Sequence, residues 1–273
     1  AVNTNHCLLL AVVCIVCYYN SLQCGFVFDD ISAIKDNRDL RPHTPIKNIF
    51  FNDFWGTPME KVRFVYLLKI HGLLLYYSFF KQNFYCIYSI LLGTKSQAYR
   101  PLCVLTFRWN YFIHQLEPFG YHLVNLILHL IVCILYYNMC SMFMSNMGSF
   151  VSSMLFAVHP IHTEAVRKIC FHIEIKIFLL TFKLTCIFLT NFQVTGVVGR
   201  AETLSSVFFL SSFIFYTRAT KQGLHVGWKS LILSMCCMAT AMFCKEQGIT
   251  IAGVCFVYEV FVAQKVNFLH AKK

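Results

Sequence analysis

The chain has 273 residues, of which 58% are hydrophobic, 16% are aromatic and only 13% are charged. Soluble proteins are about half apolar and about a quarter charged, so a soluble chain of this length would have too few charges to cover its apolar surface. The net charge of +11 raises nucleic-acid binding as an alternative, but the Lys and Arg residues lie between apolar runs rather than on one basic face. Composition therefore predicts an all-α, polytopic transmembrane helical bundle and argues against nucleic acid as a partner.

Apolar runs that approach the length of a membrane span recur along the chain. In order they are Cys7–Cys24, Tyr121–Met144, Phe150–Val158, Thr203–Tyr216, Lys229–Cys244 and Gly248–Ala263. Two further apolar stretches, Phe64–Leu92 and Ile169–Phe192, interrupt this series. The expected organisation is a first span within residues 1–28, a luminal loop over 29–117, a transmembrane bundle over 118–264 and a tail over 265–273.

The segment Phe26–Pro58 is polar, mixed in charge and rich in turn-forming residues. Its turn formers include Pro42, Pro45 and Gly56. We therefore expect an ordered loop outside the bilayer, with short helices on its surface.

Positive residues without neighbouring acids predict which span ends face the cytosol. Such residues lie between the fourth and fifth apolar runs and again after the last run; they are Arg218, Lys221, Lys229, Lys265, Lys272 and Lys273. Counting the spans back from these cytosolic ends, without the two interrupting stretches, places the amino terminus in the cytosol and the loop Phe26–Pro58 in the lumen. Four ionisable patches then lie at luminal span ends: Asp29-Asp30, His159–Glu164, Arg200–Glu202 and Lys245-Glu246. A charge at mid-bilayer costs about 2.5–3.5 kcal/mol on insertion scales, so this convergence indicates a functional site.

Metal binding is not expected from either of the two patterns that resemble it. Cys14 and Cys17 form a C-x-x-C pair, but no second pair accompanies them among the fourteen cysteines, so we interpret them as small apolar helix residues. His159 and His162 have a spacing that places them on one helical face, but Pro160 lies between them and H-E-x-x-H is absent.

Several motifs occur in a distinctive order along the chain. They are Phe26–Lys35, Phe51–Gly56, Tyr99–Leu102, Tyr121–Asn125, Phe156–Glu164, Val198–Glu202 and Cys244–Gly248. In this order they resemble the amino-terminal part of the transmembrane and tetratricopeptide-repeat (TMTC) family, and Trp55–Met59 and Val257–Phe261 look like its third vertebrate paralogue. The resemblance covers most of Phe26–Gln264. The family's further spans and repeats are not found in this sequence, so we expect at most a partial catalytic module.

The resemblance implies a GT-C type glycosyltransferase in the membrane of the endoplasmic reticulum. Such an enzyme transfers mannose from dolichyl phosphate mannose to Ser or Thr of luminal client proteins such as cadherins, with a lipid-linked donor and no cofactor. Asp29 and Asp30 follow the first span, where GT-C enzymes place their catalytic acid. Either is a candidate base, and Asp30 is slightly favoured. The alternative is that Asp30 caps a short helix beginning at Ile31.

The remaining candidates would bind the donor phosphate or sugar. Arg100, Arg200 and Lys245 are the cations, with lipid headgroup contacts from span ends as the alternative. Glu202 and Glu246 are further candidates for binding the donor. The alternative is that they form ion pairs with these cations. His159, His162 and Glu164 are expected to hydrogen-bond to sugar or phosphate, with a buried structural network as the alternative.

Residues 62–94 and 167–193 interrupt the resemblance. Lys61-Val62-Arg63, Val166-Arg167 and Lys265-Val266 can each be encoded by a sequence with an intron-donor GT, so we hypothesise that introns were translated. Genuine hydrophobic insertions are the alternative. If Ile169–Phe192 inserts as an extra span, it separates His159–Glu164 from Arg200 across the membrane and inactivates the chain.

Two function classes compete with the enzyme. A polytopic transporter would place ionisable groups near the membrane midplane, whereas the patches here lie at span ends. A non-catalytic membrane scaffold would use the same motifs structurally.

Overall fold

The computed structural model describes residues 3–59, 98–159, 196–220 and 227–263. Within these ranges the protein is helical and contains no β-strand, only an isolated bridge between Asn52 and Pro58. The predicted all-α class is therefore confirmed. The proposed insertions 62–94 and 167–193 and the tail 265–273 lie outside the described residues.

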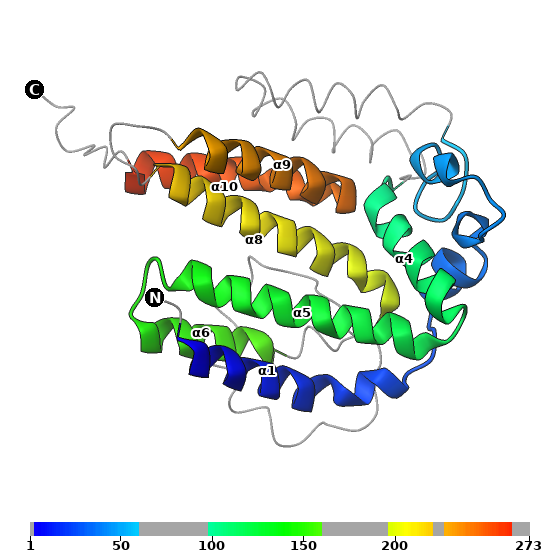
Figure 1. Ribbon diagram of the computed structural model, residues 1–273, viewed down its shortest axis with the longest axis horizontal. Coiled ribbons are helices and arrows are strands. Elements are labelled where there is room, and N and C mark those ends of the chain that lie inside the picture. Colours follow the sequence, from blue (N-terminus) through cyan, green and yellow to red (C-terminus); the bar gives the residue numbers. More distant parts are fainter. Residues whose placement is uncertain (1–2, 60–97, 160–195, 221–226, 264–273) are drawn as a thin grey trace, which may run out of the picture.

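The helices of the bundle run side by side along one direction (Figure 1). They are α1 (Thr4–Tyr18), α5 (Pro118–Cys140), α6 (Asn146–Ala157), α8 (Arg200–Thr220), α9 (Trp228–Cys244) and α10 (Ile251–Tyr258). A 3-10 turn, Tyr19–Gln23, extends α1, and a π-helical turn, Glu259–Ala263, follows α10. Helix α5 packs on α1, α6 and α8, and α8 packs on α9 and α10. The bundle thus consists of two helix groups that meet where α5 contacts α8.

Three helical segments of the described residues are long and apolar enough to cross a membrane: Thr4–Gln23, Pro118–Cys140 and Val197–Thr220. Helix α9 is apolar but shorter. Large apolar side chains point outward, such as Val16 at 72% and Ile232 at 59% exposure. Water would disfavour such faces, and lipid is the solvent that suits them. The described helices therefore belong to a membrane protein, as predicted.

The span ends predicted from hydropathy agree with the structure to within a few residues in most cases. The expected run Lys229–Cys244 corresponds to α9, for example. The expected run Thr203–Tyr216 was too short, because α8 begins at Arg200 and ends at Thr220. Ionisable residues at the two ends of α8 lower the local hydropathy, so the apolar run ends before the helix does. These residues are still helical, because their backbone groups take part in the helical hydrogen bonding.

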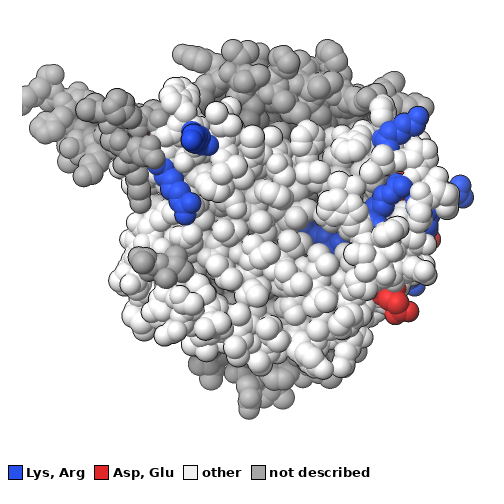
Figure 2. Space-filling model, viewed as in Figure 1, with Lys and Arg blue, Asp and Glu red and all other residues white. Residues whose placement is uncertain are grey.

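On the face drawn in Figure 2, the charged side chains of the described residues gather toward two sides, and a broad, largely uncharged surface lies between them. Arg218 is in the last turn of α8 and Lys229 is in the first turn of α9, so these two mark one end of the bundle. The patches Arg200–Glu202 and Lys245-Glu246 occupy the opposite ends of the same two helices. This separation is the charge pattern of a bundle that crosses an apolar layer.

The end of the bundle at Pro118 is covered by residues 24–59 together with α4 (Pro101–His114), and we call this unit the cap (Figure 1). The cap contains a π-helical turn and two 3-10 turns, at Ile31–Lys35, Arg38–Leu40 and Ile46–Phe50. The predicted ordered loop with short helices is therefore confirmed.

Helix α4 was not predicted, because its residues were assigned to the luminal loop. It begins with Pro101 in its first turn, where a backbone N–H group would have no partner within the helix and proline is therefore tolerated. Its Arg108 donates to the carbonyl oxygens of Asp39 (2.9 Å) and Thr44 (2.7 Å) and so ties the loop to the helix. Phe107 of α4, Phe54 of the loop and Tyr121 of α5 share one buried apolar cluster, which joins the cap to the bundle.

Candidate functional site

Charged side chains from separate parts of the chain form two ion pairs at the cap end of the bundle. Arg100, just before α4, has its Nε 3.6 Å from Oε2 of Glu246, which follows α9. Lys245 pairs through Nζ with Oε1 of Glu202 in the first turn of α8. The ion pairs given as the alternative for the two glutamates are therefore present, and their expected contact with the donor stays a prediction. Each pair joins two different elements, and neither joins neighbours in sequence. We call these four residues the ion-pair cluster.

The ion-pair cluster is partly open to solvent. The exposed fractions of the side chains are 17% for Arg100, 29% for Glu246, 11% for Lys245 and 18% for Glu202. Two cations and two carboxylates sum to no net charge, so an anion that binds here shares or displaces the glutamates. Lys carries three N–H donors and Arg carries five, so each cation has more donors than the glutamate contact uses. The cluster thus has the chemistry to hold an anionic group at a helix-bundle end.

Arg200 is placed differently from these two cations, because its side chain is entirely buried. Its guanidinium donates from Nε to Asn125 Oδ1 (2.8 Å), from Nη1 to Asn110 Oδ1 (2.5 Å) and from Nη2 to the Tyr121 carbonyl (2.9 Å). The guanidinium carbon also lies 4.7 Å from the Phe107 ring centroid. Arg200 therefore fastens α8 to α4 and α5. The prediction that it contacts the donor phosphate, and the alternative that it reaches lipid headgroups, do not fit a side chain without exposed surface.

Asp30 is also buried, at 1% exposure, and both of its carboxylate oxygens are engaged. Oδ2 accepts the backbone N–H of Val27 (3.1 Å), and Oδ1 accepts the backbone N–H of Val198 (2.9 Å). Asp30 occupies the N-cap position of the helical turn that begins at Ile31, as the alternative expects, but its side chain makes no capping hydrogen bond there. Asp30 instead ties the first turn of the cap to the residues that lead into α8.

Asp29 is exposed, unlike its neighbour, and its backbone carbonyl accepts the Ser32 hydroxyl (3.0 Å). A general base needs an oxygen that can reach the acceptor hydroxyl. Both oxygens of Asp30 already accept backbone amide protons, whereas the Asp29 side chain is exposed. Of the two carboxylates, Asp29 is therefore the one that is open to a ligand, and the assignment of a base to either residue stays a prediction.

The residue before Asp29 has an unusual backbone conformation. Phe28 has φ of +45°, in the left-handed region that bulky residues rarely adopt. Such residues cost about 1–3 kcal/mol and persist where surrounding contacts hold them. Here the holding contacts are backbone bonds from Asp30 to Val27 (3.0 Å) and from Ile31 to Phe28 (3.1 Å), together with the Asp30 side chain. The turn is thereby fixed with Asp29 on its outer side.

Of the predicted histidine patch, only His159 belongs to the described residues. It follows α6, its backbone N–H donates to the Phe156 carbonyl (3.3 Å), and its side chain is partly buried. This burial lowers the pKa of the His159 imidazole below its ordinary value and favours the neutral ring. His162 and Glu164 lie outside the described residues, so their expected contacts to sugar or phosphate stay predictions.

Asn110 and Asn125 have structural roles that the sequence analysis did not assign. Asn125 accepts from Arg200 and donates to the carbonyls of Gly196 (3.2 Å) and Val197 (3.3 Å), so it orients the start of α8. Asn110 accepts from Arg200 and donates to the Gly120 carbonyl (3.2 Å). The sequence does contain a signal for these roles, since each asparagine lies within a largely apolar stretch. A buried side-chain amide requires hydrogen-bond partners, so such an asparagine indicates a structural contact.

No family model matches the chain, and no solved structure matches it. Among curated proteins, the chain is 43% identical to "Protein O-mannosyl-transferase Tmtc3" of Drosophila melanogaster over 96% of this chain and 25% of that protein. It is 42% identical to "Protein O-mannosyl-transferase TMTC3" of Homo sapiens, over 96% of this chain and 22% of that protein. It is 37% identical to human "Protein O-mannosyl-transferase TMTC1", over 93% of this chain and 23% of that protein. The chain thus spans about a quarter of the length of these relatives. Over that span, it belongs to the TMTC family.

Proposed function

We propose that this chain is part of a protein O-mannosyltransferase that moves mannose from dolichyl phosphate mannose to Ser or Thr of client proteins. The names of the relatives support mannosyl transfer to protein. The observation that carries the proposal is an exposed Asp29 carboxylate at the same end of the bundle as the ion-pair cluster. Asp30 binds the amide of Val198, and Glu202 lies four residues further along the chain, so the Asp29 turn and the cluster meet at one end of α8.

The proposed reaction is a direct displacement at the anomeric carbon of mannose. The acceptor hydroxyl forms the new C–O bond while the bond to phosphate breaks, and dolichyl phosphate leaves. Asp29 takes the hydroxyl proton. An inverting displacement needs a carboxylate near the acceptor and forms no covalent intermediate with the enzyme.

Arg100 and Lys245 are the proposed phosphate ligands. Negative charge develops on the phosphate as it leaves, and fixed cations stabilise that charge most where little water surrounds them. The partial burial of both side chains meets this condition. Glu202 and Glu246 keep the cations in place before the donor binds. Arg200 is excluded from this role and instead positions α8.

The location and the partners follow the same proposal. The cap faces the lumen of the endoplasmic reticulum, the bundle lies in its membrane, and the clients are secretory-pathway proteins such as cadherins. The outward apolar faces of the helices contact lipid, which also brings the dolichyl chain to the site.

The test compares carboxylate variants of the intact protein. Asp29→Asn, Asp30→Asn and Asp36→Asn are expressed in cells that lack the endogenous enzyme, and transfer of radiolabelled mannose to a client is measured in microsomes. Asp36 is the matched control, because it is another exposed carboxylate in the cap. We expect Asp29→Asn to lower transfer about 10²-fold or more at unchanged protein abundance. Asp36→Asn should transfer mannose at the wild-type rate.

Wild-type transfer by Asp29→Asn would remove Asp29 as the base. Such a result would favour a non-catalytic membrane scaffold. The scaffold is the main competing function, because Arg200 and Asp30 both make structural hydrogen bonds between helices and loops. Loss of activity in Asp30→Asn alone, at normal abundance, would restore Asp30 as the base.

A further inference from the structure

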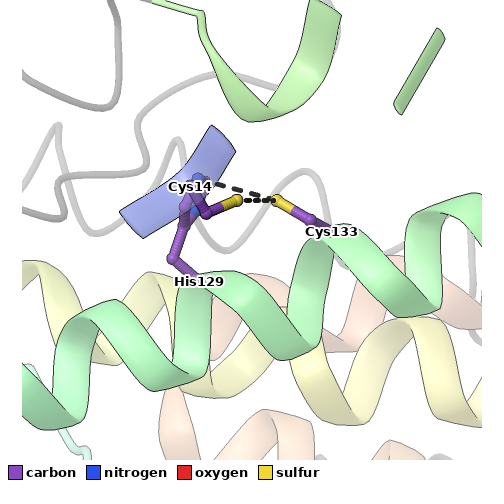
Figure 3. A group of neighbouring side chains, drawn as sticks. All are labelled: Cys14, His129 and Cys133. Atoms are coloured by element: carbon purple, nitrogen blue, oxygen red, sulfur yellow. Dashed lines mark hydrogen bonds between the residues drawn. The ribbon is translucent and has the colours of Figure 1, made fainter. Parts of the chain in front are cut away.

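A group of side chains that could hold a metal ion lies inside the bundle (Figure 3). It consists of Cys14 from α1 and of His129 and Cys133 from α5. The exposed fractions are 0% for both cysteines and 1% for His129. The two sulfurs are 3.7 Å apart, and Cys133 Sγ is 3.6 Å from His129 Nε2. All three ligand atoms lie within 4.8 Å of one another.

The arrangement follows from helix geometry. His129 and Cys133 are four residues apart, so they occupy the same face of α5. Cys14 lies on the face of α1 that packs against α5, within a buried cluster shared with Cys133. Sequence reading missed this grouping, because it looked for a second cysteine pair near Cys14 and Cys17. The partners come from a helix more than a hundred residues away.

The distances match a zinc site. Tetrahedral zinc, with Zn–S of about 2.3 Å and Zn–N of about 2.0–2.1 Å, separates two sulfurs by about 3.8 Å. The same geometry separates a sulfur from a nitrogen by about 3.6 Å. The observed separations of 3.7 Å and 3.6 Å agree with both values.

The net charge of the metal complex favours Zn²⁺ over other ions. Two thiolates and a neutral imidazole around Zn²⁺ sum to zero, and a neutral complex is the form that an apolar interior tolerates. The same ligands around Cu⁺ leave one negative charge without a partner. Magnesium and calcium prefer oxygen ligands and are excluded by the sulfur donors.

The surroundings of His129 allow coordination through Nε2. Cys133 Sγ lies within hydrogen-bond reach of that nitrogen, and the Ala157 carbonyl is 3.4 Å from it. The Tyr18 hydroxyl donates to the same carbonyl at 3.0 Å. When Nε2 turns its lone pair to a metal, the Ala157 carbonyl therefore keeps a hydrogen bond, and the ring proton resides on Nδ1.

We propose that Cys14, His129 and Cys133 bind one Zn²⁺, which links α1 to α5 within the bundle. Binding releases two thiol protons, one from each cysteine, and forms two Zn–S bonds and one Zn–N bond. One tetrahedral position remains for a further ligand. The site is separate from Asp29 and the ion-pair cluster, so it stands or falls independently of the proposed transferase activity.

The test measures zinc in the intact protein, purified in nanodiscs without a histidine tag. Cys14→Ala and Cys133→Ala are compared with Cys17→Ala, because Cys17 is exposed on the same helix as Cys14. Alanine suits helices and keeps the sites small and apolar. We expect the first two variants to contain one zinc per chain fewer than wild type, and Cys17→Ala to match wild type. Equal zinc in all three variants would overturn the proposal.

A second measurement needs no variant and therefore does not depend on folding of the mutants. Wild-type protein is alkylated with and without a membrane-permeant chelator, and each cysteine is quantified by mass spectrometry. The chelator should increase labelling of Cys14 and Cys133 several-fold and leave Cys17 unchanged. Equal alkylation of Cys14 and Cys133 with and without the chelator would overturn the zinc site. A Cys14–Cys133 disulfide in protein purified from cells would overturn it as well.

Discussion

Arg200→Met is the perturbation whose result the structure constrains most closely. The substitution keeps an unbranched side chain but removes the guanidinium. Two buried side-chain acceptors then lose their donor, Asn110 Oδ1 and Asn125 Oδ1, whereas the Tyr121 carbonyl still accepts a backbone bond within α5. An orphaned buried acceptor costs about 1–3 kcal/mol. Because Met no longer buries a charge, the lower end of that range applies to each acceptor, and we expect a loss of about 2 kcal/mol in the free energy of unfolding.

The assay is reversible unfolding of the intact protein in mixed micelles, followed by circular dichroism. Arg218→Met is the matched control, since Arg218 is an exposed arginine at the other end of the same helix. It should change stability by less than about 0.5 kcal/mol. A double-mutant cycle with Asn110→Ala should give a coupling energy of about 1 kcal/mol or more, because the two side chains share a hydrogen bond. If Arg200→Met proves as stable as Arg218→Met, Arg200 does not fasten α8, and its assignment to the donor phosphate returns.

Two further substitutions separate structure from chemistry at the cap end. Asp30→Asn replaces one acceptor oxygen by an NH₂ group that faces an amide donor, so the free energy of unfolding should fall by about 1–3 kcal/mol in the same assay, whereas Asp36→Asn should not change it. Equal stability of these two variants would contradict the role of Asp30 in tying the cap to α8. Lys245→Met should raise KM for dolichyl phosphate mannose about tenfold through loss of one phosphate contact, and Lys229→Met, at the opposite end of α9, should leave KM unchanged. A KM unaffected by Lys245→Met would remove that lysine from the donor site.

The amino-acid sequence alone determined the membrane class, the order of the bundle helices and the family, but not helix α4 of the cap. Each depends on information that is local along the chain. Apolar runs define α1, α5, α8 and α9 because lipid-facing helices require nearly continuous hydrophobicity. The ordered motifs then identify the family whatever the packing is.

Only the tertiary structure decided what each polar side chain does. Asp29 and Asp30 are adjacent and chemically identical, yet one is exposed and the other binds two amides, one of them more than 160 residues away. Arg200 and Lys245 read alike as cations at span ends, but two asparagines from other helices enclose Arg200 in the core. Cys14 meets His129 and Cys133 only because α1 packs on α5. The reason is the same in each case: burial and hydrogen-bond partners are set by contacts between distant segments, and no periodicity along the chain encodes them.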